Sequence, residues 1–445
     1  MSTKDHNSMQ QEARHEPSEE KDNLEKKFIH KTFQARNSLM TDLMKDKNAK
    51  TLYNVWPGFF LCTMLYSALK DYECEGRPYF GTRLLKSAFL HFDFALMIWF
   101  YMFLPTLCVY YGFLFWAQKR IRMQYKYLWD RTFLAFFLFY VTGMCCFSTR
   151  MVFVNNLGPA SSMAVMIEMV RFIMKSYAYI RTNCPKFINK EKDGTDPICP
   201  TFSRFWYFLF APTLVYRDVY PRSIGIRWSM VATGIAEIVS VVFFGSVALE
   251  NTYVYHLKDY GLRSYSVLEI ITLIIQYFPA GLFGYFLFHC FCHSYMNTTA
   301  ELLTFSDRLF YKDWWTTNNA YEFLAKWNIF VFDWLYIYVY KDLYVYVFPE
   351  RKYMIKLVML ILNATVHDLI ICVSCRHFLP LFLFNYTFIV VTRNILNSNK
   401  VWLCLLGSGA SFLNVLLVME YYARINCPIH NATILENIKP RFLYC

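Results

Sequence analysis

The chain has 445 residues, of which 56% are hydrophobic, 20% aromatic and only 18% charged. Soluble globular domains usually carry about 25% charged residues, so this composition excludes an ordinary soluble protein. The net charge is +12, but the cytosolic loops of membrane proteins are also rich in lysine and arginine. We therefore expect no nucleic-acid partner and interpret the surplus as a basic cytosolic face.

The chain begins with a polar, charged segment that lacks the apolar stretch of a signal peptide. We expect residues 1–51 to form a cytosolic tail whose first part is disordered. Long runs without charge follow, and a membrane-spanning helix needs roughly 20 mostly apolar residues. These runs predict an all-α polytopic protein with about nine transmembrane helices. The predicted spans are residues 52–69, 95–117, 132–149, 160–180, 228–249, 270–291, 357–375, 378–392 and 401–421.

The fourth predicted span, 160–180, contains charges. Glu168, Arg171 and Lys175 are spaced so that they share one face of a helix. Charged groups facing lipid are costly, so we expect this face to point into protein or water.

Lysine and arginine set the predicted orientation. They accumulate before the first span and in the loops 118–131, 181–227 and 393–400, whereas loops 70–86 and 250–265 mix acids and bases. By the positive-inside rule the N-terminus is cytosolic, and an odd number of spans places the C-terminus in the lumen.

Residues 327–348 alternate aromatic and other residues, as a strand would, but a lone strand cannot cross lipid. The segment also holds Asp333, Lys341 and Asp342. We predict a helix that does not span the membrane, lies at its cytosolic side and is partly buried in protein.

His367 and Asp368 lie in the middle of the predicted span 357–375, and Asn363 precedes His367 by one turn on the same face. An ionisable residue at mid-membrane marks a candidate functional site. His367 is a candidate general base, because imidazole has a pKa near neutrality and can take a proton from an alcohol. The alternative is a polar pair that joins two helices.

Two short motifs resemble metal or redox sites. His289 and His293 flank a Cys-Phe-Cys sequence, and Cys372 and Cys375 form a CxxC pair. No second pair occurs at zinc-finger spacing, and the CxxC pair lacks a thioredoxin-like context. We expect both motifs to be structural and expect no metal site.

An unusual aromatic motif lies between the sixth and seventh predicted spans. An acid precedes two adjacent tryptophans there, whereas an interfacial aromatic belt usually has no such acidic partner. The motif residues are Phe310, Tyr311, Lys312, Asp313, Trp314 and Trp315.

With this motif the chain resembles the sterol O-acyltransferases (acyl-CoA:cholesterol acyltransferases) of the membrane-bound O-acyltransferase (MBOAT) superfamily. Their motif F-Y-x-D-W-W-N is matched from Phe310 to Thr316. The resemblance runs from about residue 32 to the C-terminus and includes further stretches. These are Phe208–Asp218, Tyr220–Arg222, Arg171–Lys175, Phe305–Phe310, and the ending from Glu420 through Cys427 to Cys445.

The resemblance implies an MBOAT fold with an internal catalytic tunnel over residues 52–425, and a luminal C-terminal tail over 426–445. The family's catalytic histidine matches His367, and its catalytic asparagine, in a Trp-Asn pair, matches Asn328. In the family this pair faces a tunnel where acyl-CoA from the cytosol meets sterol from the bilayer.

The resemblance also implies an acyl-CoA site and a disulfide. The expected acyl-CoA-binding residues are Tyr340, Lys352, Asn363, Phe332 and Lys326, and the expected disulfide joins Cys427 and Cys445.

The chain departs from the family at several of these positions. Asn363 replaces a serine, Phe332 a histidine, and Ala325 a CoA-contacting arginine, with Lys326 beside it. Thr316 replaces the last asparagine of the motif, and Asp368 replaces a glutamate after the histidine.

The expected function is esterification of a sterol 3-hydroxyl with a long-chain acyl group from acyl-CoA, giving a steryl ester and CoA. We expect no cofactor beyond the co-substrate acyl-CoA, contact with membrane lipid, a homodimer or homotetramer, and a location in the endoplasmic reticulum membrane. The alternatives are an acyltransferase for another lipid alcohol such as diacylglycerol, or a non-catalytic lipid-binding or regulatory homologue. A transporter would show paired inverted repeats, which the sequence does not.

Overall fold

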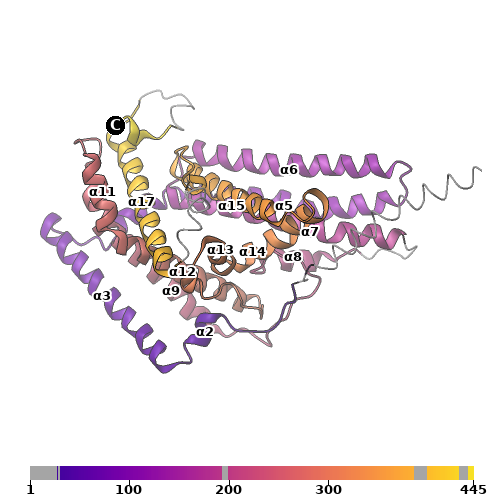
Figure 1. Ribbon diagram of the computed structural model, residues 1–445, viewed down its shortest axis with the longest axis horizontal. Coiled ribbons are helices and arrows are strands. Elements are labelled where there is room, and N and C mark those ends of the chain that lie inside the picture. Colours follow the sequence, from indigo (N-terminus) through magenta and orange to yellow (C-terminus); the bar gives the residue numbers. More distant parts are fainter. Residues whose placement is uncertain (1–27, 29–30, 193–198, 385–397, 430–438) are drawn as a thin grey trace, which may run out of the picture.

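The computed structural model describes residues 28, 31–192, 199–384, 398–429 and 439–445. Within these ranges the chain is helical and contains only isolated β-bridges, which confirms the all-α prediction. Figure 1 shows long helices lying side by side, with the C-terminus at one end of the molecule. The helices are α2 (Leu39–Leu43), α3 (Lys47–Glu75), α4 (Thr82–Ala88), α5 (Phe92–Arg120), α6 (Lys126–Val154), α7 (Pro159–Lys192), α8 (Phe202–Phe210), α9 (Trp228–Leu249), η1 (Glu250–Val254), α10 (Tyr255–Leu257), α11 (Val267–Gln276), α12 (Phe278–Leu302), η2 (Trp314–Thr316), α13 (Ala320–Trp327), α14 (Ile329–Trp334), η3 (Leu335–Tyr340), η4 (Leu343–Val347), α15 (Lys352–Cys375), α17 (Asn399–Asn426) and η5 (Arg441–Leu443).

Several of these helices can cross a membrane. Among the described residues, five helical segments are long and apolar enough, and the pair α11 and α12, bent by 52°, makes a sixth if it counts as one span. The predicted spans 52–69 and 160–180 lie inside α3 and α7, which are outside that set. The predicted span 378–392 falls mostly outside the described residues. A polytopic membrane protein is therefore confirmed, while the number nine stays a prediction.

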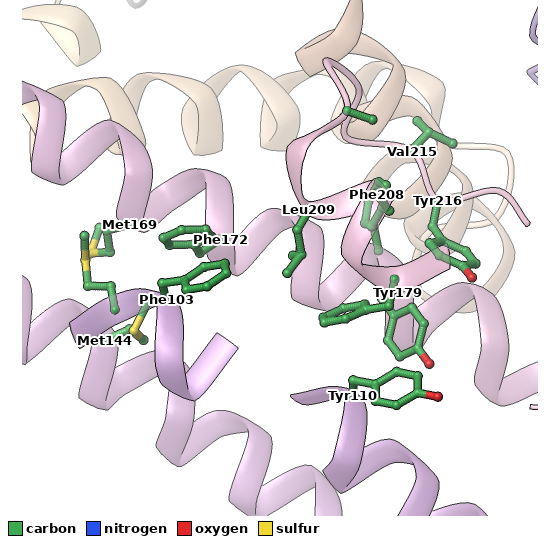
Figure 2. Close-up of a cluster of buried hydrophobic side chains, with 14 of the residues drawn as sticks. Phe103, Tyr110, Met144, Met169, Phe172, Tyr179, Phe208, Leu209, Val215 and Tyr216 are labelled. Atoms are coloured by element: carbon green, nitrogen blue, oxygen red, sulfur yellow. The ribbon is translucent and has the colours of Figure 1, made fainter. Parts of the chain in front are cut away.

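The largest buried cluster joins α5, α6, α7 and α8. Phe103 on α5 packs against Phe172 on α7, and Tyr179 packs against Tyr216 in the loop after α8 (Figure 2). Buried aromatic pairs contribute about 0.5–1.5 kcal/mol beyond the area that they bury. Many of the aromatic residues in the sequence therefore pack between these four helices and stabilise their arrangement.

The charged face of α7 points into protein, as predicted. Lys175 is buried, and its Nζ donates hydrogen bonds to the carbonyl oxygens of Phe208, Leu209 and Ala211 at 2.6, 2.9 and 2.8 Å. The carbonyls at a helix C-terminus have no partner within the helix, so the ammonium group caps α8.

Helix α12 packs between α9 and α17. A Cβ atom at Gly281 would lie 2.5 Å from the carbonyl oxygen of Gly407 and 2.6 Å from the amide nitrogen of Ser411. Only glycine therefore permits this close approach of α12 and α17.

The segment 327–348 is helical, as predicted, and two of its turns are π-helical. It is partly buried, and Arg181 on α7 binds Asp342 through two hydrogen bonds of 2.8 Å. That the segment lies at the cytosolic side of the membrane remains a prediction. The alternating aromatic residues fit a helix because Tyr336, Tyr340 and Tyr344, spaced four residues apart, stack along one face.

The second part of the predicted tail packs on the helices. Arg36 donates to the carboxylate of Asp307 at 2.6 and 3.1 Å, and Phe33 lies edge-on to Tyr220 at 5.1 Å between centroids. Helix α2 follows, with Ser38 as its N-cap.

Candidate active site

His367 lies on α15, and its ring orientation is set by its own helix. Its Nδ1 is 2.8 Å from the carbonyl oxygen of Asn363, one turn earlier. A carbonyl oxygen can only accept, so Nδ1 carries the proton and Nε2 of the neutral ring has a free lone pair. The side chain is exposed and lies beside the ring of Phe382, 5.3 Å away between centroids.

Asp368, next to His367, is buried and faces another segment. Its two carboxylate oxygens accept hydrogen bonds from the main-chain amides of Phe382 and Leu383 at 2.8 and 2.9 Å. Asp368 is adjacent to His367 in the sequence, but in the structure its carboxylate binds the main chain at 382–383. Since these partners lie fourteen and fifteen residues away, no local pattern could identify them.

Asn328 lies at the break between α13 and α14. Its Oδ1 accepts from the amide of Val331 at 3.4 Å, so the side chain is the N-cap of α14. Within the part of the chain that the structure describes, its Nδ2 makes no hydrogen bond. The acceptor end of the amide is thus fixed by the helix, and the donor end is left for a ligand.

The aromatic motif holds this break in place. The amide of Ile329 donates to the carbonyl of Phe310 at 2.9 Å, and the amide of Lys312 donates to the carbonyl of Lys326 at 2.8 Å. These bonds flank Asn328 on both sides. The motif therefore acts on the candidate catalytic asparagine through the main chain.

The buried side of the motif contacts α12. Trp314 is completely buried, and its Nε1 donates to Nδ1 of His289 at 3.1 Å. The ring of Tyr311 lies edge-on to His289, 4.2 Å between centroids, and its hydroxyl hydrogen-bonds to His293. The two histidines that resembled a metal motif are thus partners of the aromatic motif. This pairing depends on tertiary packing and has no signal in the sequence.

The outer side of the motif is polar. The hydroxyl of Thr316 donates to the main-chain carbonyl and the carboxylate of Asp313, at 2.7 and 2.8 Å. Lys326 forms ion pairs with Asp313 at 3.4 Å and Glu322 at 3.0 Å. The hydrogen bond from Thr316, together with Lys326, lowers the pKa of Asp313 below its ordinary value. Thr316, which departs from the family motif, therefore contacts Asp313 in this chain.

Most of the expected acyl-CoA residues lie on a helical hairpin, whose first arm runs from α14 through η4 and whose second arm is α15. Tyr340 is buried and stacks between Tyr336 and Tyr344, at 5.4 and 6.2 Å between centroids. Lys352 is exposed at the start of α15, whereas Phe332 lies on α14, 6.1 Å from the ring of Tyr321. Lys326 lies at the motif, and Asn363 is buried one turn before His367.

The hairpin relates His367 to Asn328. Leu335 on one arm and Met359 on the other belong to one buried cluster, and the arms meet at the turn 348–351. Asn328 precedes Leu335 by seven residues, and His367 follows Met359 by eight. Asn328 therefore lies farther from the turn than Leu335 on its arm, and His367 lies farther from it than Met359 on the other. Both residues are therefore at the end of the hairpin away from its turn.

The described residues line an open, apolar hollow of about 410 Å³. It lies against His289 and Trp315, and neither His367 nor Asn328 lines it. The predicted catalytic tunnel stays a prediction.

Cys427 and Cys445 form a disulfide, as expected. It packs on Gly261, which has a φ of +90°, and a Cβ there would lie 2.4 and 2.7 Å from the two sulfur atoms. The disulfide thus ties the C-terminal end to the loop after α10.

The chain is similar to known enzymes over most of its length. It is 32% identical to sterol O-acyltransferase 1 of Rattus norvegicus and 33% identical to that of Cricetulus griseus, in both cases over 93% of this chain and 78% of the relative. The chain belongs to the sterol O-acyltransferase family. It is also 32% identical to sterol O-acyltransferase 2 of Rattus norvegicus, over 93% of this chain and 81% of the relative. No family model matches the chain. The resemblance found in the sequence is confirmed.

Proposed function

We propose that the protein transfers a long-chain acyl group from acyl-CoA to the 3-hydroxyl of a sterol. The observation that carries this proposal is the position of His367, an exposed residue on a helix apolar enough to span a membrane, with its Nδ1 hydrogen-bonded to the carbonyl of Asn363. The relatives named sterol O-acyltransferase 1 and 2 supply the reaction class.

The proposed reaction is a direct transfer. Nε2 of His367 accepts the proton of the sterol hydroxyl while its oxygen attacks the thioester carbonyl carbon. The new C–O bond forms, the C–S bond breaks, and CoA leaves as a thiolate, which then takes the proton from the imidazolium. A thiolate is a good leaving group because thiol pKa values are about 8.5.

Asn328 is the proposed donor to the thioester oxygen. Its Oδ1 caps α14, so Nδ2 is the end of the amide that can face the negative charge developing on that oxygen. Removal of one such donor typically lowers the rate about 10²–10³-fold.

The acyl-CoA site is proposed along the hairpin. The exposed ammonium group of Lys352 can pair with a CoA phosphate, and the stacked ring of Tyr340 offers an apolar surface with a hydroxyl. Phe332, Asn363 and Lys326 complete the proposed contacts. No cofactor besides acyl-CoA is part of the proposal.

The proposed location is the endoplasmic reticulum membrane, with the N-terminus in the cytosol and residues 426–445 in the lumen. The disulfide between Cys427 and Cys445 supports a luminal tail, because disulfides persist in oxidising compartments. The catalytic domain is proposed over 52–425, after a cytosolic tail over 1–51, and the assembly is proposed as a homodimer or homotetramer.

Expression in acyltransferase-deficient cells given labelled oleate tests the acceptor. The proposal expects label in steryl ester. Label in triacylglycerol would replace the sterol by diacylglycerol as acceptor, and label in neither product from a well-expressed protein would favour a non-catalytic homologue.

A further inference from the structure

The segment that leads into α2 reaches the hairpin that carries most of the proposed acyl-CoA residues. We call it the strap and define it as Phe28 and residues 31–38; in Figure 1 it is the dark extended stretch before α2. The end of the strap next to α2 is firmly attached. The main-chain amide of Arg36 donates to the carbonyl of Ser306 at 2.9 Å, and the amide of Arg308 donates to the carbonyl of Arg36 at 3.2 Å. This end therefore has a fixed position on the loop after α12.

The other end of the strap is held by fewer contacts. Lys31 forms an ion pair with Asp333 on α14, and both side chains are partly exposed. The carbonyl of Lys31 accepts a long hydrogen bond of 3.4 Å from the guanidinium of Arg217. Ion pairs that water reaches add little stability, and segments with few contacts open locally at low cost. The end that contains Phe28 and Lys31 can therefore detach while Arg36 stays in place.

Phe28 at this loose end packs on a row of tyrosines. Tyr336, Tyr340 and Tyr344 stack along one face of the first hairpin arm. The ring of Phe28 lies against all three, at 6.2, 6.1 and 5.3 Å between centroids. Tyr340, in the middle of the row, is only 9% exposed. Phe28 is thus part of what covers the Tyr340 ring.

Both contacts of the loose end fall on the proposed acyl-CoA site or next to it. Tyr340 is one of the proposed acyl-CoA contacts, and Asp333 directly follows another, Phe332. Both faces of the Tyr340 ring are stacked on neighbouring tyrosines. A ligand can therefore meet this ring only at its rim, and Phe28 packs against the same row there.

We propose that the loose end of the strap is an autoinhibitory cover on the acyl-CoA site, with Phe28 on the Tyr340 ring in place of the ligand. The inference rests on the proposed function, because it takes Tyr340 as an acyl-CoA contact. A ligand that binds only the uncovered form has an apparent affinity reduced by the fraction of molecules in that form. Removal of the cover should therefore tighten acyl-CoA binding and leave the reacting groups unchanged.

Binding of a non-transferable thioether analogue of oleoyl-CoA to the purified full-length protein measures the cover. Phe28→Ala should bind the analogue about two- to tenfold more tightly than the wild type, because it removes a set of aromatic contacts. The KM for oleoyl-CoA should fall by a similar factor. The kcat should stay at the wild-type value, because saturating oleoyl-CoA uncovers the site in every molecule.

Phe89→Ala is the matched control for the loss of a ring. Phe89 is also partly exposed and packs edge-on to another phenylalanine, Phe92, at 5.8 Å between centroids. It lies outside the strap and the hairpin. Phe89→Ala should bind the analogue as the wild type does, and a gain equal to that of Phe28→Ala would contradict the cover.

Lys31→Glu tests the second contact of the loose end. Two carboxylates then face each other at Asp333, so the loose end should detach and the analogue should again bind more tightly. The further change Asp333→Lys restores an ion pair with the charges exchanged, and should return the affinity to the wild-type value. A merely structural loss at either position would not be reversed in this way. Unchanged or weaker binding by Phe28→Ala or by Lys31→Glu would overturn the cover.

The cover and the proposed function can fail separately. If Phe28→Ala binds the analogue more tightly but neither it nor the wild type forms steryl ester, the cover stands and the proposed reaction fails. If the wild type forms steryl ester but Phe28→Ala binds the analogue no more tightly, the cover fails and the proposed function stands. Folded wild-type and variant proteins that all fail to bind the analogue would overturn both.

Discussion

The amide of Ile329 donates a 2.9 Å hydrogen bond to the carbonyl of Phe310, so the first residue of the aromatic motif is joined to the residue after Asn328. Together with the bond from Lys312 to Lys326, it holds the chain on both sides of Asn328, at the break between α13 and α14. The tryptophans and the tyrosine of the motif contact α12 rather than the proposed reacting groups.

Asn328→Asp should separate capping from catalysis. An aspartate caps a helix N-terminus about as well as an asparagine does, so the melting temperature should stay close to wild type. The variant loses the Nδ2 donor, so turnover should fall about 10²–10³-fold. Asn328→Ala should lose the same activity and also about 1 kcal/mol of stability. Thermal unfolding and oleoyl transfer measured on the same preparations check both effects. An active Asn328→Asp enzyme would remove Asn328 from the mechanism.

Trp314→Phe should destabilise the protein by about 1–3 kcal/mol, because it leaves Nδ1 of His289 buried without its donor. The comparison is Trp315→Phe, at a neighbouring residue that is only partly buried. Melting temperatures of both variants in the same detergent give the answer. A larger loss for Trp315→Phe than for Trp314→Phe would contradict the importance of the Trp314–His289 bond.

Lys175→Met should cost about 3 kcal/mol or more, because three carbonyl groups at the end of α8 lose a charged donor inside the protein. Lys186→Met is the control: Lys186 pairs with Asp218 at the surface, where such pairs contribute about 0–1 kcal/mol. Yields of folded protein after gel filtration, with thermal unfolding, distinguish the two. Equal behaviour of both variants would mean that the cap on α8 is dispensable.

Asp313 should not contribute to the pH dependence of activity between pH 5 and 8. Its pKa is lowered by the Thr316 hydrogen bond and by Lys326, so the carboxylate is ionised over this whole range. A lowered pKa contributes stability above the unfolded-state value, and this stability is lost only as the pH falls below about 4. Thr316→Val should therefore leave the shape of the pH–activity profile unchanged from pH 5 to 8. A new acidic limb in that variant would show that Thr316 controls a group that titrates there.

Much of the fold follows from the sequence because apolar runs of sufficient length leave a helix few alternatives in a membrane. The charged face of α7 was predictable for the same reason, since Lys175 cannot face lipid. The confirmed disulfide between Cys427 and Cys445 came from the resemblance to the family.

The remaining features depend on contacts between distant segments. Asp368 binds the amides of Phe382 and Leu383, and Trp314 binds His289, although nothing in either local sequence marks these pairs. The bend of 52° between α11 and α12 was not predicted, because the apolar run 270–291 continues across it, although Pro279 in the first turn of α12 marks the place.

The central claim is that Nε2 of His367 is the general base for acyl transfer. Its most direct test is the release of CoA and the formation of cholesteryl oleate from oleoyl-CoA and cholesterol by purified wild-type and His367→Ala protein. His377→Ala serves as the control, because His377 is a buried histidine outside the proposed mechanism. We predict that His367→Ala folds, as judged by gel filtration and melting temperature, and forms no ester above background, while His377→Ala remains active. Turnover of His367→Ala at the wild-type rate would contradict the mechanism.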